Sequence, residues 1–143
     1  NRLQKYTNPE VYYAQYQRFS GLTDVNISNV NFVFYPAAVT VTDAWNTAGF
    51  TTTAGNINGE LQLLNTGSVS FANCSFEKMS VSPFNAATLS VTLSTFNGLD
   101  AYAIKDIKAT TATITGTTFT DCNGGFWFNN APTTLTVTGN TFT

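Results

Sequence analysis

The 143-residue chain carries six basic and eight acidic residues, a net charge of -2, and is 14% aromatic but 10% charged. So little basic character excludes an electrostatic footprint for nucleic acid or an anionic membrane, and no apolar run is long enough to span a bilayer. Surface polarity must come from Ser, Thr and Asn, which favours exposed strand faces over solvated helices. Because the chain has no histidine, we expect any metal site to use oxygen ligands.

The N-terminal segment, residues 1–23, contains the best helix signal in the chain. Asn8 can cap a helix over residues 8–20, and Gly21 follows as a stop. Its aromatic residues recur at spacings of four and three, on one helix face: Tyr12, Tyr16 and Phe19. We expect this face to pack on the rest of the domain as a cap. The alternative is an aromatic platform for sugars or a partner chain.

From residue 24 onward the chain repeats an eight-residue template of apolar and hydroxyl residues that ends in phenylalanine. The three clearest copies lie 23 residues apart and occupy residues 89–96, 112–119 and 135–142. Looser copies occupy residues 25–32 and 69–76. Short strands cannot bury an apolar face alone, and such a period is typical of a solenoid in which each strand pairs with its equivalent one turn later.

The segment between the first two copies is irregular. Phe76 follows Phe32 by 44 residues, which allows either two turns of about 22 residues or one turn with an insertion. Residues 46–59 are polar and rich in Gly and Asn, and are the expected projecting loop. The sequence leaves the number of turns in this segment open.

The last repeat resembles a known superfold. Residues 124–130, Gly-Gly-Phe-Trp-Phe-Asn-Asn, followed by the final template copy, resemble a coil of the pectin-lyase-like right-handed parallel β-helix. The resemblance is good over residues 60–143 and weak over residues 24–59. We therefore predict an all-β right-handed parallel β-helix of about five turns over residues 24–143, behind the short N-terminal helix. The superfold hosts lyases, hydrolases, tailspikes, adhesins and surface repeats, so it indicates no single activity.

The acidic residues form no catalytic constellation in the sequence. Asp100 and Asp121 occupy different positions of the repeat, and both arginines lie in the N-terminal segment. Glycoside hydrolysis needs two carboxylates across one bond, and lyase chemistry needs a base together with a cation. We therefore predict no catalytic residue, no cofactor, no metal site and no enzyme activity.

Two kinds of covalent modification can be assessed from the repeat. Cys74 and Cys122 fall about two rungs apart, which is about 9–10 Å along the solenoid axis and beyond the reach of a disulfide. We predict that both are unpaired. Asn26 and Asn73 begin N-glycosylation acceptor motifs, which matter in a secretory eukaryotic host.

Aligning the phenylalanines places Ser or Thr at three alternate positions of each regular copy, with apolar residues between them. These nine candidate binding residues are Thr88, Ser90, Thr92, Thr111, Thr113, Thr115, Thr134, Thr136 and Thr138. With the apolar residues inward, the hydroxyls form a flat grid spaced about 6.7 Å along a strand and about 4.8 Å between rungs. Strand propensity and stacked Thr pairs explain such a grid. It also resembles the ice-binding face of β-solenoid antifreeze proteins.

These features lead to three hypotheses about function. The first is a structural or adhesive module at the cell surface or outside the cell. Its C-terminal end shows no cap, so we expect either a longer solenoid or a subunit that stacks into a filament. The module would bind further copies of itself, other chains of a surface assembly or glycans, and would not bind nucleic acid. The second is a carbohydrate-binding or carbohydrate-active protein with aromatic contacts from Trp45 and Trp127. The third is an ice-binding protein.

Overall fold

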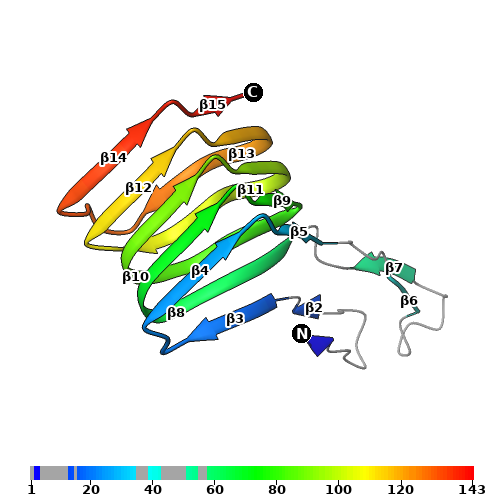
Figure 1. Ribbon diagram of the computed structural model, residues 1–143. Helices are drawn as coiled ribbons and strands as arrows, with labels where there is room; N and C mark the ends of the chain where they lie inside the picture. The colour runs from blue at the N-terminus through cyan, green and yellow to red at the C-terminus, as the bar shows by residue number, and fades with distance from the viewer. Residues whose placement is uncertain (1, 4–12, 15, 35–38, 43–50, 55–57) are drawn as a thin grey trace.

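The computed structural model describes residues 2–3, 13–14, 16–34, 39–42, 51–54 and 58–143. These residues contain no helix and form an 11-stranded sheet with two small antiparallel pairs. The large sheet winds into a parallel β-solenoid of about four turns (Figure 1). The predicted all-β solenoid is therefore confirmed.

Each turn of the solenoid, here called a rung, contributes a strand to three faces. The first or hydroxyl face contains β4 (Asp24–Ser28), the end of β8 (Gly59–Ala72), the end of β10 (Met79–Thr92), β12 (Thr111–Thr115) and β14 (Thr134–Thr138). The second face contains β5 (Asn31–Val33), β9 (Ser75–Glu77), the starts of β11 (Thr95–Lys108) and β13 (Thr118–Phe128), and β15 (Thr141–Phe142). The third face contains β3 (Tyr16–Ser20), the starts of β8 and β10, and the ends of β11 and β13.

The irregular segment after β5 is an insertion within a single turn. β4 pairs directly with β8, and β5 pairs directly with β9, so the 44-residue step completes one rung. This is why the solenoid has about four turns where the sequence predicts about five. Within the insertion, β6 (Val39–Thr42) and β7 (Thr51–Ala54) pair antiparallel. The predicted loop over residues 46–59 lies partly outside the described residues.

The N-terminal segment contributes strands in its described part. β1 (Arg2–Leu3) pairs antiparallel with β2 (Tyr13–Ala14). Within the helix predicted over residues 8–20, residues 8–12 and 15 lie outside the described ones, and Tyr13–Ala14 belong to β2. The last five residues of this predicted helix form β3, which pairs in parallel with β8. The unpaired backbone along the edge of β8 accounts for this, because tertiary pairing overrides a weak local helix preference.

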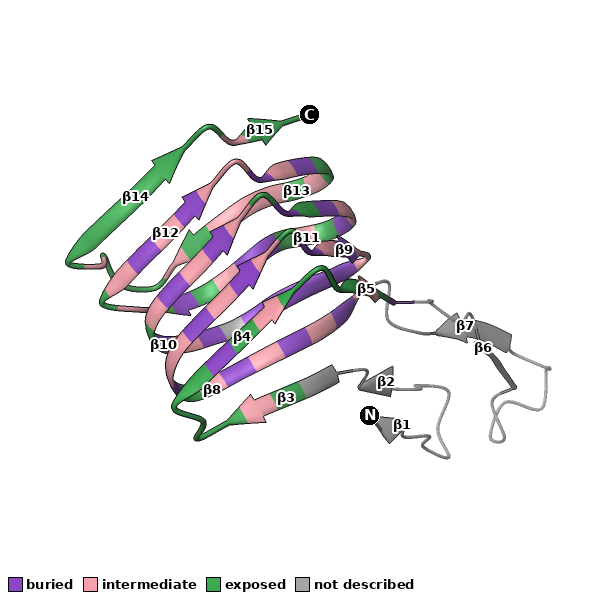
Figure 2. Ribbon diagram, in the orientation of Figure 1, coloured by how far each residue is buried: buried purple, intermediate pink, exposed green. Residues whose placement is uncertain are grey.

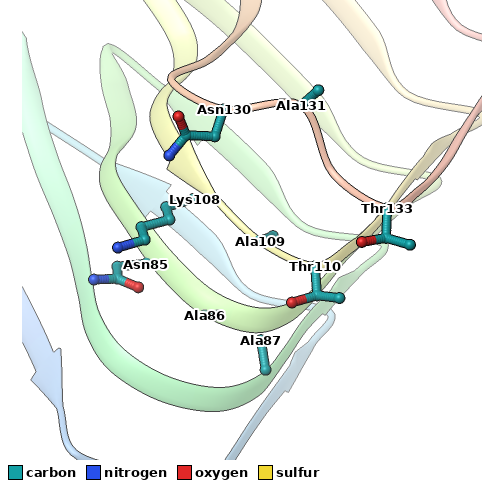
Figure 3. Close-up of a pocket in the computed structure, with 9 residues that line it drawn as sticks. All are labelled: Asn85, Ala86, Ala87, Lys108, Ala109, Thr110, Asn130, Ala131 and Thr133. Carbon is teal, nitrogen blue, oxygen red and sulfur yellow. The ribbon is translucent and has the colours of Figure 1, made fainter.

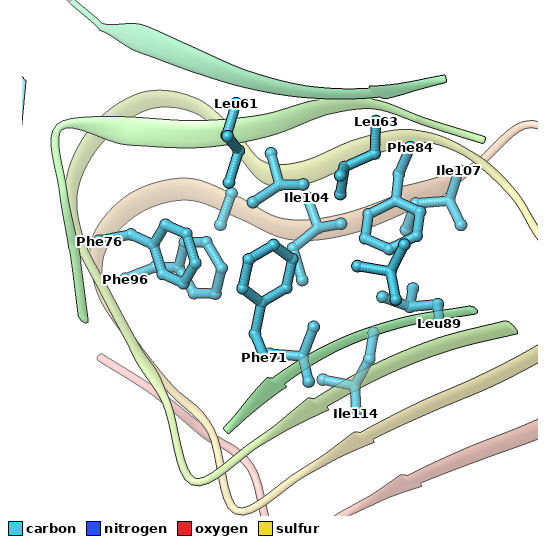
Figure 4. Close-up of a cluster of buried hydrophobic side chains, with 14 of the residues drawn as sticks. Leu61, Leu63, Phe71, Phe76, Phe84, Leu89, Phe96, Ile104, Ile107 and Ile114 are labelled. Atoms are coloured by element: carbon cyan, nitrogen blue, oxygen red, sulfur yellow. The ribbon is translucent and has the colours of Figure 1, made fainter. Parts of the chain in front are cut away.

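The phenylalanines that end the template stack through the core. Neighbouring rings lie within 9° of parallel, with centroids 4.9, 4.3, 5.4 and 4.9 Å apart. The stack runs through Phe32, Phe76, Phe96, Phe119 and Phe142. Figure 4 shows Phe76 and Phe96 together beside inward-pointing Leu and Ile side chains. Each aromatic pair adds about 0.5–1.5 kcal/mol beyond its burial, so the stack joins every rung to the next.

Two apolar columns line the inner side of the hydroxyl face. One column is Val25, Val69, Leu89, Ala112 and Leu135, and the other is Ile27, Phe71, Val91, Ile114 and Val137. In the three central rungs all six of these side chains are 0% exposed. Burying a Val, Leu, Ile or Phe contributes about 1.5–3 kcal/mol. The predicted alternation, apolar inward and hydroxyl outward, is confirmed.

The corner after the hydroxyl face requires a left-handed backbone on every rung. The residues at this corner have φ between 49° and 65° and are Asn29, Asn73, Leu93, Gly116 and Gly139. Gly and Asn tolerate this conformation, whereas Leu93 does so at a cost. On the inner rungs the next residue, Cys74, Ser94 or Thr117, is buried, whereas Val30 of the first rung is apolar and 38% exposed. The Ser94 hydroxyl accepts a hydrogen bond from the Cys74 amide at 3.1 Å, and the Asn140 side chain accepts one from the Thr117 amide at 2.8 Å.

Both cysteines are free thiols, as predicted. Cys74 is buried at the corner after the hydroxyl face, where its thiol lies 3.5 Å from the Ile27 carbonyl oxygen. Cys122 lies in a different column, paired with Leu99 across the β11–β13 ladder. The separation of the two thiols follows from the register of the rungs.

Candidate functional site

The hydroxyl face places the nine predicted Ser and Thr residues in three straight rows across β10, β12 and β14. The rows are Thr88–Thr111–Thr134, Ser90–Thr113–Thr136 and Thr92–Thr115–Thr138. Their side chains are half-buried on β10 and β12 and exposed on β14. Each position is paired with its equivalent in the next rung without a register shift. The predicted grid is thus present over three rungs.

The same rows lose their regularity toward the N-terminal end. There they begin with Asp24, Asn26 and Ser28 of β4, followed by Ser68, Ser70 and Ala72 of β8. Asn26 and Asn73, which begin the two glycosylation motifs, are both exposed. The Asn73 amide donates a hydrogen bond to Asn29 Oδ1 at 2.6 Å. A regular hydroxyl surface therefore belongs to the C-terminal half of the solenoid.

The titratable side chains do not converge. Among the described residues, no three His, Cys, Asp or Glu side chains group as metal ligands. A shallow pocket of about 400 Å³ at the corner between the second and third faces is lined by Leu99, Asp100, Asp121, Cys122 and Asn123. Burial raises the pKa of the Cys122 thiol above its ordinary value of 9.0, and the Asp121 and Glu77 carboxylates raise it further. The thiol is therefore neutral at pH 7 and is not an activated nucleophile.

One of the two predicted aromatic contacts lies on the third face. Trp127 of β13 is 53% exposed and meets Tyr102 of β11, with ring centroids 5.6 Å apart and planes tilted by 58°. A Cβ atom at Gly124 would lie 2.3 Å from the Tyr102 ring, so this position must be glycine for the ring to rest there. Trp45, the other predicted contact, lies outside the described residues.

A groove of about 330 Å³ follows the corner between the third face and the hydroxyl face. It crosses three rungs, and alanines form much of its lining. Asn85, Lys108 and Asn130 stand along one side of it, opposite Thr110 and Thr133 (Figure 3). Its amide, ammonium and hydroxyl groups offer polar contacts along the solenoid wall.

The C-terminal rung, formed by β14 and β15, exposes side chains that the other rungs bury. Leu135, Val137 and Phe142 are 48%, 37% and 57% exposed. Ala112 and Ile114, which occupy the equivalent inward positions one rung earlier, are 0% exposed. Figure 2 shows that β14 is exposed along its whole length. These three side chains form an apolar surface at this end of the solenoid.

The strand edge beside this apolar surface carries no charge. Among the described residues β14 pairs with β12 alone, so its other edge has free backbone groups. Residues 122–143 contain no Asp, Glu, Lys or Arg. Sheet proteins commonly block an exposed edge with charged residues, proline or a bulge. The strand Thr134–Thr138 has none of these, so it can accept a further strand.

The sequence predicts the inward direction of Leu135 and Val137 but not the meeting of Tyr102 with Trp127. The signal for that contact is the register that pairs Tyr102 with Gly124, which no local pattern specifies.

Comparisons with protein-family models, curated proteins and solved structures found no match to this chain. No helix among the described residues is long and apolar enough to cross a membrane.

Proposed function

We propose that this chain is a structural or adhesive β-solenoid module of the cell surface or extracellular space, which is extended by a rung added to its C-terminal rung. The observation that carries the proposal is the exposure of Leu135, Val137 and Phe142 beside an uncharged strand edge. A rung whose parallel strands pair with β14 and β15 would cover these side chains and continue both ladders. The added rung can come from the same polypeptide or from another chain of the assembly.

The rest of the solenoid supports a structural role. The phenylalanine stack runs from Phe32 to Phe142. The inward columns of the central rungs are fully buried. A repeat stack of this kind gains stability from each neighbouring interface, so its length can grow without a new core. Such a wall displays its outer faces at fixed spacings, as an adhesive or scaffolding surface requires.

Sedimentation velocity of the 143-residue chain at rising concentration tests the proposal. We expect the wild-type chain to form larger species, because rung addition buries the apolar surface of the C-terminal rung. Val137→Lys should remain monomeric, since it places a charge in that surface. Thr113→Lys, on an outward position of an inner rung, is the control and should associate like the wild type. A wild-type chain that stays monomeric at every concentration would overturn rung addition.

The unbroken register of the hydroxyl face favours one second candidate, ice binding. Three rows of three hydroxyl side chains on β10, β12 and β14 present a repeated two-dimensional spacing. Thermal hysteresis of the purified chain is the direct readout. Thr113→Tyr should abolish hysteresis because the ring breaks the middle row. Thr120→Tyr, at an exposed position of the second face, should leave it unchanged. No hysteresis in the wild type at high concentration would eliminate this candidate.

A further inference from the structure

The exposed aromatic pair on the third face differs from every other aromatic cluster in the described part of the chain. The phenylalanine rings of the inner rungs lie in the core and Phe142 ends their stack, whereas Tyr102 and Trp127 lie outside this stack and are 36% and 53% exposed. Their rings meet at 5.6 Å across neighbouring strands. The core of the solenoid gains little from two exposed rings, and an exposed aromatic surface is a common mark of a binding site.

The tyrosine ring is held close to the backbone of the next rung. A Cβ atom at Gly124 would meet Tyr102 Cδ1 and Cε1 at 2.3 Å each and Cζ at 3.0 Å. The Cδ1–Cε1 side of the ring is therefore nearest to this position, and the ring lies against Gly124. This close approach restricts the side chain before any ligand binds, which lowers the entropic cost of binding.

Polar residues precede Tyr102 and its partner Gly124 on their two strands. The corner pocket of about 400 Å³ includes Asn123, the neighbour of Gly124, and Asp100, two residues before Tyr102. Asp121 lines the same pocket. Asp100, Asp121 and Asn123 are all exposed. The two carboxylates can accept hydrogen bonds from hydroxyl groups, and the Asn123 amide can both donate and accept.

The arrangement matches the two-sided chemistry of a sugar ring. A pyranose has an apolar face of C–H groups that can cover an aromatic ring and an equatorial rim of hydroxyls that can reach neighbouring acceptors. The charge at the pocket selects among sugars. Asp100 and Asp121 would repel the carboxylates of a uronic acid polymer.

We propose that the surface formed by Tyr102, Trp127 and the Asp100–Asp121 pocket binds an uncharged polysaccharide. A sugar ring covers the aromatic pair, and its hydroxyls donate hydrogen bonds to the two carboxylates. This site lies on the third face and does not depend on rung addition at β14. It assigns the solenoid a glycan-binding wall in addition to its structural role.

Affinity gel electrophoresis with soluble glucan, mannan and xylan, and with polygalacturonate as the charged comparison, tests this site. We expect at least one neutral polymer to retard the wild-type chain, with little retardation by polygalacturonate. Trp127→Ala should weaken retardation by about tenfold or more, as for an aromatic contact at the centre of a binding site. Leu93→Ala, at a side chain that is 69% exposed on another corner, is the control and should bind like the wild type.

A second variant tests the role of the charges. Asp100→Asn combined with Asp121→Asn keeps hydrogen-bonding groups in the pocket but removes both negative charges. We expect this variant to bind polygalacturonate more tightly than the wild type does. Circular dichroism should show that all variants keep the strand spectrum. Unchanged mobility with every neutral polymer would overturn the glycan site, and equal wild-type retardation by polygalacturonate would overturn its selectivity.

Discussion

The two ends of the solenoid carry equivalent residues in unequal surroundings. Val25 of the first rung and Leu135 of the last occupy the same inward column, yet Val25 is 6% exposed and Leu135 is 48% exposed. Near the first rung, Arg18 Nε donates a hydrogen bond to Gln62 Oε1 at 2.9 Å, whereas residues 122–143 have no charged side chain. The comparison shows that the repeat alone does not decide burial, because each rung also depends on what covers it.

The largest expected effect is a difference in lost unfolding free energy between lysine substitutions at two positions of one inward column. One position lies on an inner rung and the other on the C-terminal rung. Ile114→Lys should cost more than about 4 kcal/mol of unfolding free energy, because an ammonium group would be buried without a partner. Val137→Lys, one rung later, should cost less than about 1 kcal/mol, since its side chain reaches water. Urea unfolding followed by circular dichroism measures both. Equal losses would show that the C-terminal rung is as enclosed as the inner one.

The phenylalanine stack gives a second matched pair. Phe96 is 0% exposed between two stacked rings, and Phe142 at the end of the stack is 57% exposed. Phe96→Ala should destabilise the chain by about 3–5 kcal/mol through cavity formation. Phe142→Ala should cost about 1 kcal/mol, because less area leaves water on folding. If denaturant midpoints shift equally for the two variants, the difference between the two rungs is refuted.

The regular part of this fold could be predicted from the sequence because its information is local. The 23-residue steps between phenylalanines and the alternation of Leu135, Thr136 and Val137 specify the stack, the inward columns and the hydroxyl rows. The template also specifies parallel pairing, because equivalent residues must lie over one another to bury the same face. For this reason the sequence predicts all nine members of the hydroxyl grid.

The irregular parts depend on pairing between distant residues and could not be predicted in the same way. Whether the 44-residue step makes one turn or two depends on β4 pairing with β8. The third face shifts register between Leu99 and Tyr102 and again between Ile104 and Ile107, so template spacing does not place Tyr102 beside Trp127. At β3 the local sequence pattern favours a helix, but pairing with the free edge of β8 makes this segment a strand.

A smaller effect concerns the corner that runs from one end of the solenoid to the other. Leu93 has φ 49° where the equivalent residues are Asn or Gly. Leu93→Asn should raise the unfolding free energy by about 0.5–1 kcal/mol, because Asn tolerates the left-handed conformation better. Gly116→Ala should do the reverse, since φ is 58° there and the new Cβ would lie 2.9 Å from Leu93 Cδ2. Thermal unfolding of both variants checks the two signs.

The smallest effect is a pH dependence near the C-terminal half. Burial and the neighbouring Asp121 and Glu77 carboxylates raise the pKa of Cys122 above its ordinary value, so folding favours the neutral thiol. Its contribution to stability is complete below the unfolded pKa and is lost as the pH rises through the folded pKa. As the pH rises through the ordinary titration range of a thiol and above it, the wild type should therefore lose more unfolding free energy than Cys122→Ser. Parallel pH profiles for the two proteins would contradict this assignment.

Amide hydrogen exchange of the two end rungs at several protein concentrations tests the central claim most directly. The account predicts that amides of β14 exchange fast in dilute solution and gain protection as concentration rises, because an added rung pairs with the free edge. Protection of β4 should stay constant over the same range. If β14 is as protected as β12 at the lowest concentration, or if its protection does not change with concentration, then the C-terminal rung is not the surface through which this solenoid is extended.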